Sequence, residues 1–220
     1  MPRDSTITRE KLIRAAEYLF ARQGFDVPIR DIQERAGQRN ATALQYHFGG
    51  KRELLAAIIE KHAPPAEEIE AVRQDLASRQ HDPRGLVEAI VRRIAKTLAT
   101  EETRDYARLS FQLVTQAPVR QSMIDGKAAS LSMSVPAESA LIRACVPGLP
   151  DRLVQERAVA GFTFMLQQVA DRARMIDDND SRGLLDEEDF LANLVDMTTA
   201  LLTAPTSAVK ATKTTSAAAS

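Results

Sequence analysis

A glycine break at Gly37, between two short helical segments, constrains the fold more than any other feature of the sequence. Residues 28–36 have the spacing of one short amphipathic helix, and residues 40–47 have that of a second. In and beside the second segment, only Leu44 and Phe48 are large and plainly apolar. So short a helix is not stable through its own burial. Neighbouring helices must therefore hold it, and its opposite face is left free for another contact.

Two short helices joined by a tight glycine turn describe a helix-turn-helix, in which the second helix enters the major groove of DNA. The free face of residues 40–47 carries small and polar side chains that suit this role. Ala43 lets a helix approach base edges closely, Gln45 can bond adenine at two positions, and Tyr46 can donate to a phosphate. An ordinary helical hairpin with a solvated face explains the same spacing equally well.

The rest of the sequence is also helical in character, and we expect an all-α fold with an N-terminal helix-turn-helix domain and a larger helical domain. Ala and Leu are abundant, and long stretches lack runs of β-branched residues. The chain has no run of about 18 apolar residues, so we expect no membrane span. The opening MPRDSTITRE has no apolar signal-peptide core. Cys145 is the single cysteine, which excludes an internal disulfide and fits a reducing cytoplasm.

The charge distribution separates the two ends of the chain. Residues 1–52 hold 10 Lys and Arg against 6 Asp and Glu, whereas the remaining residues hold 19 against 24. A modestly basic head on an acidic body is the asymmetry expected if only the head meets a polyanion.

Residues 8–55 resemble the DNA-binding domain of the tetracycline-repressor (TetR) family of transcriptional regulators. The matching features are the alanines of RAAEYLF, Gly24-Phe25, RDI ahead of Ala36-Gly37, YHF followed by a glycine, Lys51, and Glu53-Leu54-Leu55. The resemblance covers under a quarter of the chain. It implies a DNA-binding head followed by a divergent all-helical domain that dimerises and holds a ligand.

The resemblance also implies roles for single residues. Leu44 matches the buried leucine of the family, and Lys51 matches the lysine that starts the fourth helix and reaches a phosphate. Gln45 and Tyr46 match the pair ahead of His-Phe that often meets DNA, and Asn40 stands where the family usually has a capping Ser. The DNA-binding residues predicted in this way are Arg39, Asn40, Thr42, Ala43, Gln45, Tyr46, His47 and Lys51.

Two departures from the family pattern affect the DNA contacts rather than the fold. The turn holds an extra residue in Gln38-Arg39-Asn40, and we interpret GQRN followed by YHF as the mark of a subfamily. Pro28 stands where a capping Ser or Thr is usual.

Helical periodicity predicts the remaining elements. Thr8 is expected to cap a helix that ends at Gln23. After Leu55 a helix is predicted to continue to about residue 63 and, after a kink at Pro64-Pro65, to resume over 67–79. Further helices are predicted at 83–98, 103–116, 150–174 and 186–202. We therefore expect a DNA-binding domain at residues 1–50, a ligand-binding and dimerisation domain at 51–203, and a low-complexity, disordered tail at 204–220.

The helices at 150–174 and 186–202 each have two apolar faces, which suits one contact within the chain and one with a partner subunit. A fully buried core helix is the alternative. The residues predicted at a dimer interface are Val154, Ala158, Gly161, Leu191, Leu194, Val195 and Leu201.

A small, largely apolar effector is expected between the helices at 103–116 and 150–174, because they carry more large apolar groups than one face needs. Packing of these helices on each other is an equally good explanation. The residues predicted to line the effector site are Tyr106, Leu109, Phe111, Leu113, Phe162, Met165 and Gln168.

The sequence has no motif of metal, cofactor or enzyme chemistry. His47, His62 and His81 lack metal-ligand spacing, and there is no HExxH, Walker loop, GxSxG or dinucleotide fingerprint. We expect no metal, no cofactor and no catalysis. The sequence predicts a cytoplasmic homodimeric transcriptional repressor that binds a palindromic double-stranded DNA operator and is released by an unknown small molecule. An activator, or a regulator controlled by a protein partner, is the alternative.

Overall fold

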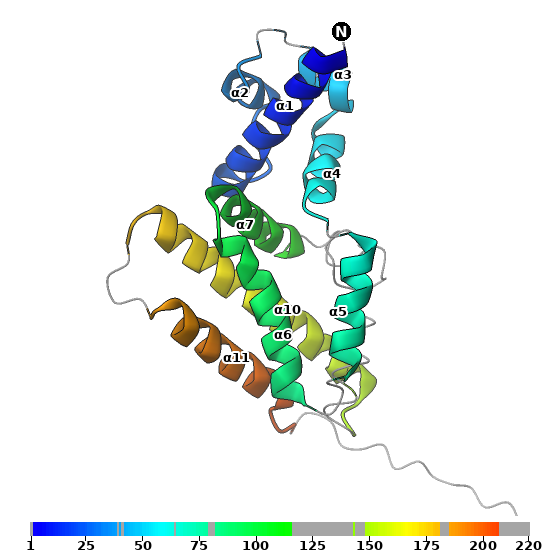
Figure 1. Ribbon diagram of the computed structural model, residues 1–220, viewed down its shortest axis with the longest axis vertical. Coiled ribbons are helices and arrows are strands. Elements are labelled where there is room, and N and C mark those ends of the chain that lie inside the picture. Colours follow the sequence, from blue (N-terminus) through cyan, green and yellow to red (C-terminus); the bar gives the residue numbers. More distant parts are fainter. Residues whose placement is uncertain are drawn as a thin grey trace, which may run out of the picture.

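The computed structural model describes residues 2–38, 40, 42–63, 65–78, 82–115, 143, 148–180 and 185–206, and every regular element within these ranges is a helix (Figure 1). The all-α prediction is confirmed for this part of the chain. The elements are α1 (Pro2–Gln23), α2 (Ile29–Arg35), α3 (Ala43–Phe48), α4 (Lys51–Lys61), α5 (Ala66–Ser78), α6 (Pro83–Ala95), the 3₁₀ turn η1 (Lys96–Leu98), α7 (Glu101–Thr115), α10 (Asp151–Asp177) and α11 (Glu187–Thr203).

The four N-terminal helices pack around one apolar core, and we call α1 to α4 the head. Phe20, Ile32, Leu44 and Leu54, one from each helix, are at most 1% exposed. Full burial of each such side chain stabilises the fold by about 1.5–3 kcal/mol. This shared core holds the six-residue α3, which is too short to be stable alone.

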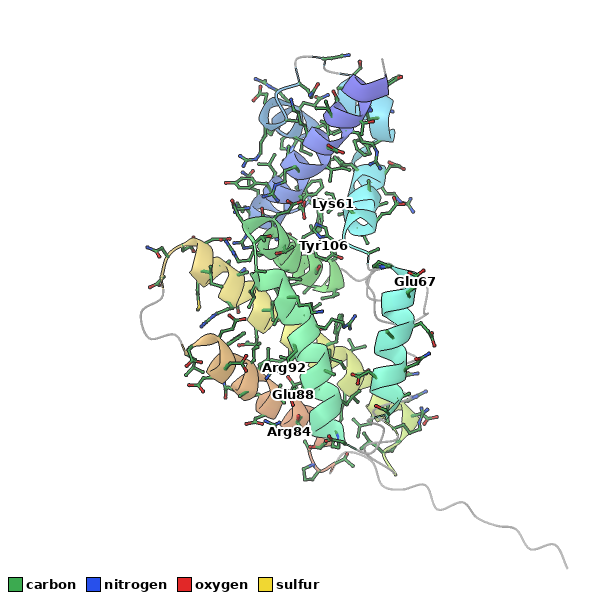
Figure 2. All side chains as sticks on the ribbon, in the orientation of Figure 1. Lys61, Glu67, Arg84, Glu88, Arg92 and Tyr106 are labelled. Carbon is green, nitrogen blue, oxygen red and sulfur yellow. The ribbon has the colours of Figure 1, made fainter. Side chains whose placement is uncertain are left out.

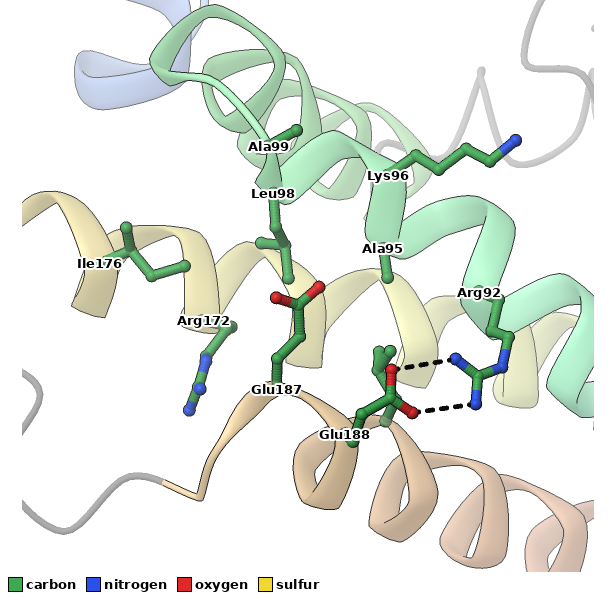
Figure 3. A pocket seen from close by; sticks show the side chains of 10 residues that line it. Arg92, Ala95, Lys96, Leu98, Ala99, Arg172, Ile176, Glu187 and Glu188 are labelled. Atoms are coloured by element: carbon green, nitrogen blue, oxygen red, sulfur yellow. Dashed lines mark hydrogen bonds and ion pairs between the residues drawn. The ribbon is translucent and has the colours of Figure 1, made fainter.

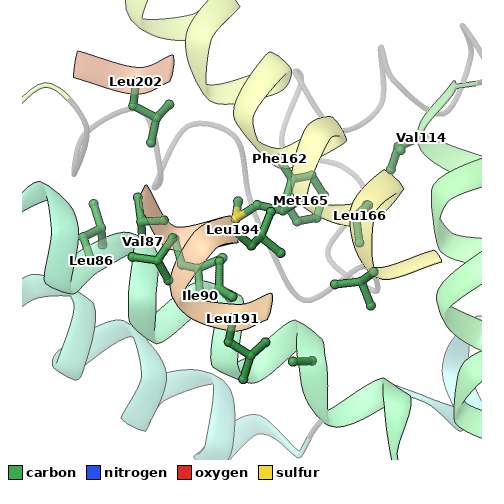
Figure 4. Close-up of a cluster of buried hydrophobic side chains, with 14 of the residues drawn as sticks. Leu86, Val87, Ile90, Val114, Phe162, Met165, Leu166, Leu191, Leu194 and Leu202 are labelled. Atoms are coloured by element: carbon green, nitrogen blue, oxygen red, sulfur yellow. The ribbon is translucent and has the colours of Figure 1, made fainter. Parts of the chain in front are cut away.

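A second apolar core lies among α6, η1, α7, α10 and α11, which we call the body (Figure 4). Helix α10 is central in it, because it packs on α7, α11 and α6. Two stripes of α10 are therefore buried rather than one. The core includes Leu86, Val87 and Ile90 of α6, Phe162, Met165 and Leu166 of α10, and Leu191, Leu194 and Leu202 of α11.

Helix α7 contributes to both cores. Its Leu109 and Leu113 are at most 1% exposed and belong to the head core, whereas Ala107 and Val114 belong to the body core. In Figure 1 α7 lies directly below the C-terminal end of α1. The Gln112 side-chain amide donates to the Ala21 carbonyl of α1 at 3.0 Å. The head thus rests on a helix of the body.

Some helix boundaries differ from those expected. Helix α1 begins at Pro2 rather than at Thr8, because proline is compatible with a first helical turn. Helix α6 ends at Ala95 rather than at Leu98, and the chain tightens into η1 from Lys96 to Leu98. The described part of the chain contains no helix that is both long and apolar enough to span a bilayer.

Five predictions concern residues outside the described ranges. They are the DNA contact of Arg39, the kink at Pro64, the absence of a metal role for His81, the unpaired thiol of Cys145, and the disordered character of 207–220 within the predicted tail.

Candidate nucleic-acid interface and head–body junction

The turn between α2 and α3 is built from glycine geometry and one buried amide. Gly37 has φ +67°, a conformation that favours glycine, and it ends α2. The backbone N–H of Gln38 donates to the backbone carbonyl of Gln33 at 2.9 Å. Gln33 is itself buried, and its side chain donates to the Asn40 carbonyl at 3.3 Å. The turn is therefore held from inside the head.

Asn40 organises the start of α3 but is not its N-cap, which differs from the expectation. Its carboxamide oxygen accepts hydrogen bonds from the backbone N–H of Thr42 at 2.9 Å and from the Thr42 hydroxyl at 2.8 Å. Thr42 occupies the N-cap position without a side-chain cap bond. The N-cap therefore lies two positions after Asn40, and Asn40 forms an Asx-type turn ahead of it.

Helix α3 has one buried and one exposed side. Ala43 and Leu44 are 6% and 0% exposed and pack in the head core. Gln45 is exposed, and Tyr46 is 81% exposed. The outward positions of Gln45 and Tyr46 agree with the sequence interpretation, whereas Ala43 faces inward and is not available to base edges.

His47 and Phe48 lie at the edge of the exposed side of α3. The Tyr46 and His47 rings meet edge to face with centroids 5.1 Å apart. His47 is only half-exposed, and the guanidinium of Arg9 in α1 lies 5.3 Å from the Phe48 ring centroid. Gly49, at φ +79°, ends α3. Tyr46 is thus the aromatic side chain of the YHF string that projects furthest into solvent.

Lys51 begins α4 as expected, but its ammonium has a partner within the chain. Its Nζ donates to the Val27 carbonyl at 2.8 Å and so ties α4 to the loop between α1 and α2. An ammonium has three donors, so one bond to Val27 leaves two for a phosphate.

Buried carboxylates join the head to the body. Asp105 of α7 is fully buried and pairs with Arg22 of α1 and, at 2.6 Å, with Arg108 of its own helix. Arg14 of α1 stands 3.8 Å from the same carboxylate. Burial raises the pKa of Asp105, although Arg22, Arg108 and Arg14 favour its charged form.

The ionic contacts continue from α7 into α10. Arg108 is buried and pairs with Asp177 of α10, and Arg104 pairs with the same carboxylate at 2.6 Å. Burial works against the charged carboxylate, but the hydrogen bonds from Arg104 and Arg108 lower the pKa of Asp177. A continuous chain of charged groups therefore runs from α1 through α7 to α10.

A second cluster closes around Glu17 of α1, which is fully buried. Its carboxylate lies 2.8 Å from the Lys61 ammonium and 2.5 Å from His62 Nε2. Lys61 also pairs with Glu102 of α7, and Figure 2 labels Lys61 and Tyr106 in the region where head and body meet. Burial disfavours the ammonium, but hydrogen bonds to Glu102 and Glu17 raise the pKa of Lys61. Among the described residues, Glu17, His62 and Glu102 are the group whose donor atoms lie close enough for one metal ion.

The sequence pattern missed both buried carboxylates, although a signal was present. Glu17 shares the apolar stripe of Ile13 and Phe20, and Asp105 shares that of Leu109. A charged residue on an apolar stripe indicates a buried ion pair. Its partner was not readable, since His62 lies 45 residues from Glu17.

The residues predicted to line an effector site are distributed over three environments. Leu109 and Leu113 are in the head core, so they do not line a cavity of the body. Tyr106 also packs against the head core. Phe162 and Met165 are buried in the body core, where Phe111 packs from the side, and Gln168 is half-exposed. Their register differs from the expectation because α7 turns its Leu109 stripe to the head.

A cavity of about 400 Å³ in the described part of the body lies elsewhere, between α6, η1, α10 and α11 (Figure 3). Ala95, Leu98 and Leu191 give it an apolar floor. On its rim Arg92 donates to both carboxylate oxygens of Glu188, at 3.0 and 3.3 Å. None of the predicted effector residues lines it.

The residues predicted for a dimer interface are largely inside one chain. Val154, Ala158, Leu191, Leu194 and Val195 are at most 5% exposed in the body core, which differs from the expectation. Gly161 is also buried, and Leu201 is half-buried. The cause is the central position of α10, which buries both of its apolar stripes.

The same two helices have a different outward face. On α10 Ala160 is exposed and Phe164 is half-buried. On α11 Met197 is 39% exposed, Ala200 is exposed and Leu201 is half-buried. We call these five residues the α10–α11 outer face.

The comparisons with known proteins address the head. The family model described as "Bacterial regulatory proteins, tetR family" matches residues 12–58, from α1 to α4. The matched residues include the whole helix-turn-helix, so the chain is similar to this family over its N-terminal part. The subfamily indicated by GQRN and YHF stays a prediction.

Comparisons over the whole chain add little to this. No curated protein matches the chain. Among solved structures it is similar to one described as "Crystal structure of gamma-butyrolactone receptor (ArpA-like protein)", with 20% identity over 90% of this chain and 83% of that chain. The TM-score is 0.24, so this likeness carries no conclusion about the present chain.

Proposed function

We propose, from the premise that residues 12–58 are a TetR-family DNA-binding domain, that the chain is a cytoplasmic transcriptional repressor that binds a palindromic operator as a homodimer and is released by a small molecule. The single observation that supports this best is the exposed side of α3. Gln45 and Tyr46 project from a helix whose Leu44 is locked in the head core.

In this proposal α3 lies in the major groove. Gln45 reads bases, because a carboxamide can bond adenine at N6 and N7 together. Thr42, at the start of the same helix, is exposed and reaches a base edge or a phosphate. Tyr46 and Lys51 bond phosphates and so fix the register of the helix on the duplex. His47 positions the Tyr46 ring through their edge-to-face contact.

Dimerisation is needed because one α3 contacts too few base pairs for specific binding, whereas two copies spaced one helical turn apart read two half-sites. We propose the α10–α11 outer face as the interface. Its exposed Met197, Ala160 and Ala200 are apolar, small or flexible, and they let the helices of a second copy approach closely.

Release requires that the effector bind one spacing of the two heads better than the other, with about 1–3 kcal/mol of coupling being typical. Helix α7 supports such coupling, since it packs in both cores and carries the Asp105 ion pairs. A shift of α7 in the body therefore moves the surface against which the head packs.

The test is a selection of bound DNA from a random pool, followed by binding measurements on the selected site with and without a metabolite extract. We expect a palindromic site bound by two chains and weakened by the extract. A non-palindromic site bound by one chain would overturn the dimer proposal. A reporter gene that becomes more active when the regulator is present would favour an activator.

A further inference from the structure

We propose that Glu17, His62 and Glu102 form a binding site for a divalent transition-metal ion at the head–body junction. The three side chains come from α1, from the C-cap of α4 and from α7. Their donor atoms all lie within 4.8 Å of one another. Metal ions are commonly held by such a group of nitrogen and oxygen ligands, completed by water.

The three side chains already lie together, but not at coordination distances. His62 Nε2 and a Glu17 oxygen are 2.5 Å apart, which is a hydrogen bond, so the two atoms must separate by about 1 Å to share an ion at bond lengths of about 2.0–2.2 Å. The Glu17 side chain is fully buried, and that of His62 is 12% exposed. The Glu102 side chain is 41% exposed, which leaves solvent access for the ion and for water ligands.

The His62 ring is fixed in this orientation by a neighbour. It stacks on Tyr106 with centroids 4.0 Å apart and an interplanar angle of 14°. Stacking restrains rotation of the imidazole and keeps Nε2 directed at Glu17. A ligand that is held before binding loses less conformational entropy when the metal arrives.

Lys61 occupies the same place when no metal is bound. Its ammonium pairs with both Glu17 and Glu102, the two carboxylates of the proposed site. The Lys61 side chain is 32% exposed, so it can turn outward to solvent. A dication then replaces the ammonium between the carboxylates and binds the lone pair of His62 Nε2, with the N–H of the neutral imidazole on Nδ1.

The donor set defines the class of ion. One imidazole and two carboxylates suit zinc and its neighbours better than magnesium, which prefers oxygen ligands alone. We expect affinity to fall in the order Zn²⁺, Mn²⁺, Mg²⁺. Because the ligands belong to α1, α4 and α7, the bound ion fastens the head to the body.

The test uses the full chain with Cys145→Ser, so that the single thiol takes no part. The protein is stripped with a chelator, and Zn²⁺ alone is titrated by calorimetry and by thermal melting. We expect one Zn²⁺ per chain and a higher melting temperature. Lys61→Gln removes the competing ammonium and should tighten Zn²⁺ binding about tenfold. His62→Gln and Glu102→Gln should each weaken it by a similar factor.

His47→Gln is the matched control, since it removes a histidine far from the junction and should leave Zn²⁺ binding unchanged. The proposal fails if Lys61→Gln is destabilised and Zn²⁺ does not restore its melting temperature, because the cluster is then an ion-pair network only. If Lys61→Gln does not fold, comparison of the Cys145→Ser parent with Glu102→Gln decides. Equal Zn²⁺ uptake by these two proteins, or none by the parent, overturns the proposal. Neither readout uses DNA, so failure here leaves the proposed function standing.

Discussion

Tyr106 of the body lies face to face with His62 at the end of the head, with their rings 4.0 Å apart and nearly parallel. The contact places an aromatic ring of α7 directly against the C-cap of α4. Burial raises the pKa of Tyr106, as expected for a phenol enclosed at an interface. Head and body therefore meet through a stacked pair as well as through ion pairs.

Replacement of Tyr106 by Ala should lower the free energy of unfolding by about 3 kcal/mol, because a large ring leaves a packed interface. Tyr106→Phe keeps the stacked ring and should cost only about 1 kcal/mol, through the lost hydroxyl. Urea unfolding of both variants measures the difference. Equal losses for Ala and Phe would show that the ring contact contributes nothing.

On the exposed side of α3, Gln45→Ala should relax base preference by about 1–3 kcal/mol at particular base pairs. Lys51→Ala should instead weaken binding to all duplexes and reduce the salt slope by about 1, as expected for a phosphate contact. Binding-site selection and salt titrations measure the two effects. Gln155→Ala, exposed on α10, is the matched control and should change neither. An unchanged motif with Gln45→Ala would contradict the base-reading role.

Met197→Glu on the α10–α11 outer face should give a folded monomer that has lost operator binding. Ala192→Glu, exposed on the other flank of α11, should remain a dimer. Leu194→Glu should unfold the protein, since Leu194 is 0% exposed in the body core and a charge there has no partner. Sedimentation and circular dichroism separate these results. A dimeric Met197→Glu protein would place the interface elsewhere.

Phe162 distinguishes core packing from a ligand wall. It is 6% exposed in the body core, so Phe162→Ala should cost about 3–5 kcal/mol of stability. Phe164→Ala, half-buried on the outer face, should cost clearly less. Thermal melts of the pair measure this. A small loss at Phe162 together with a blunted response to the metabolite extract would indicate that the ring borders an effector instead.

The Asp177 carboxylate should make stability depend on acid. Hydrogen bonds from Arg104 and Arg108 lower its pKa in the folded state below that of the unfolded chain, against the effect of burial. The stabilisation is therefore complete above about pH 4, near the unfolded pKa, and is lost as the pH falls through the lower folded value. The difference in free energy of unfolding between the unsubstituted protein and Asp177→Asn should therefore become smaller as the pH falls below about 4. A gap that is constant from pH 6 to pH 3 would exclude the linkage.

More of the side-chain positions could be predicted from the sequence in the head than in the body, for a physical reason. In the head α3 is short and buries only one side, so the exposed positions of Gln45 and Tyr46 follow from the position of Leu44. Ala43 was misplaced because the start of α3 depends on the Asn40 turn, whose hydrogen bonds have no periodic signal.

In the body, periodicity predicted two apolar faces on α10 and α11 but not which side meets which partner. Val154 and Leu194 were assigned to a second subunit, yet both are 0% exposed within one chain. The choice depends on α7, α10 and α6 packing together, and contacts between distant segments leave no trace in the spacing of a single helix. For the same reason, the contact between Glu17 and His62 could not be predicted from the sequence.

Because Leu109 and Leu113 fill the head core from α7, we expect that the head does not fold independently. A fragment that stops at the end of α4 would leave the space of two leucines empty and the buried Glu17 without Glu102 nearby. The protein should therefore unfold as one cooperative unit, with amide protection in α1 rising and falling together with that of α7. We expect any event that loosens α7 to reach the exposed side of α3 as a change in the stability of the head itself, and not only as a change in its position.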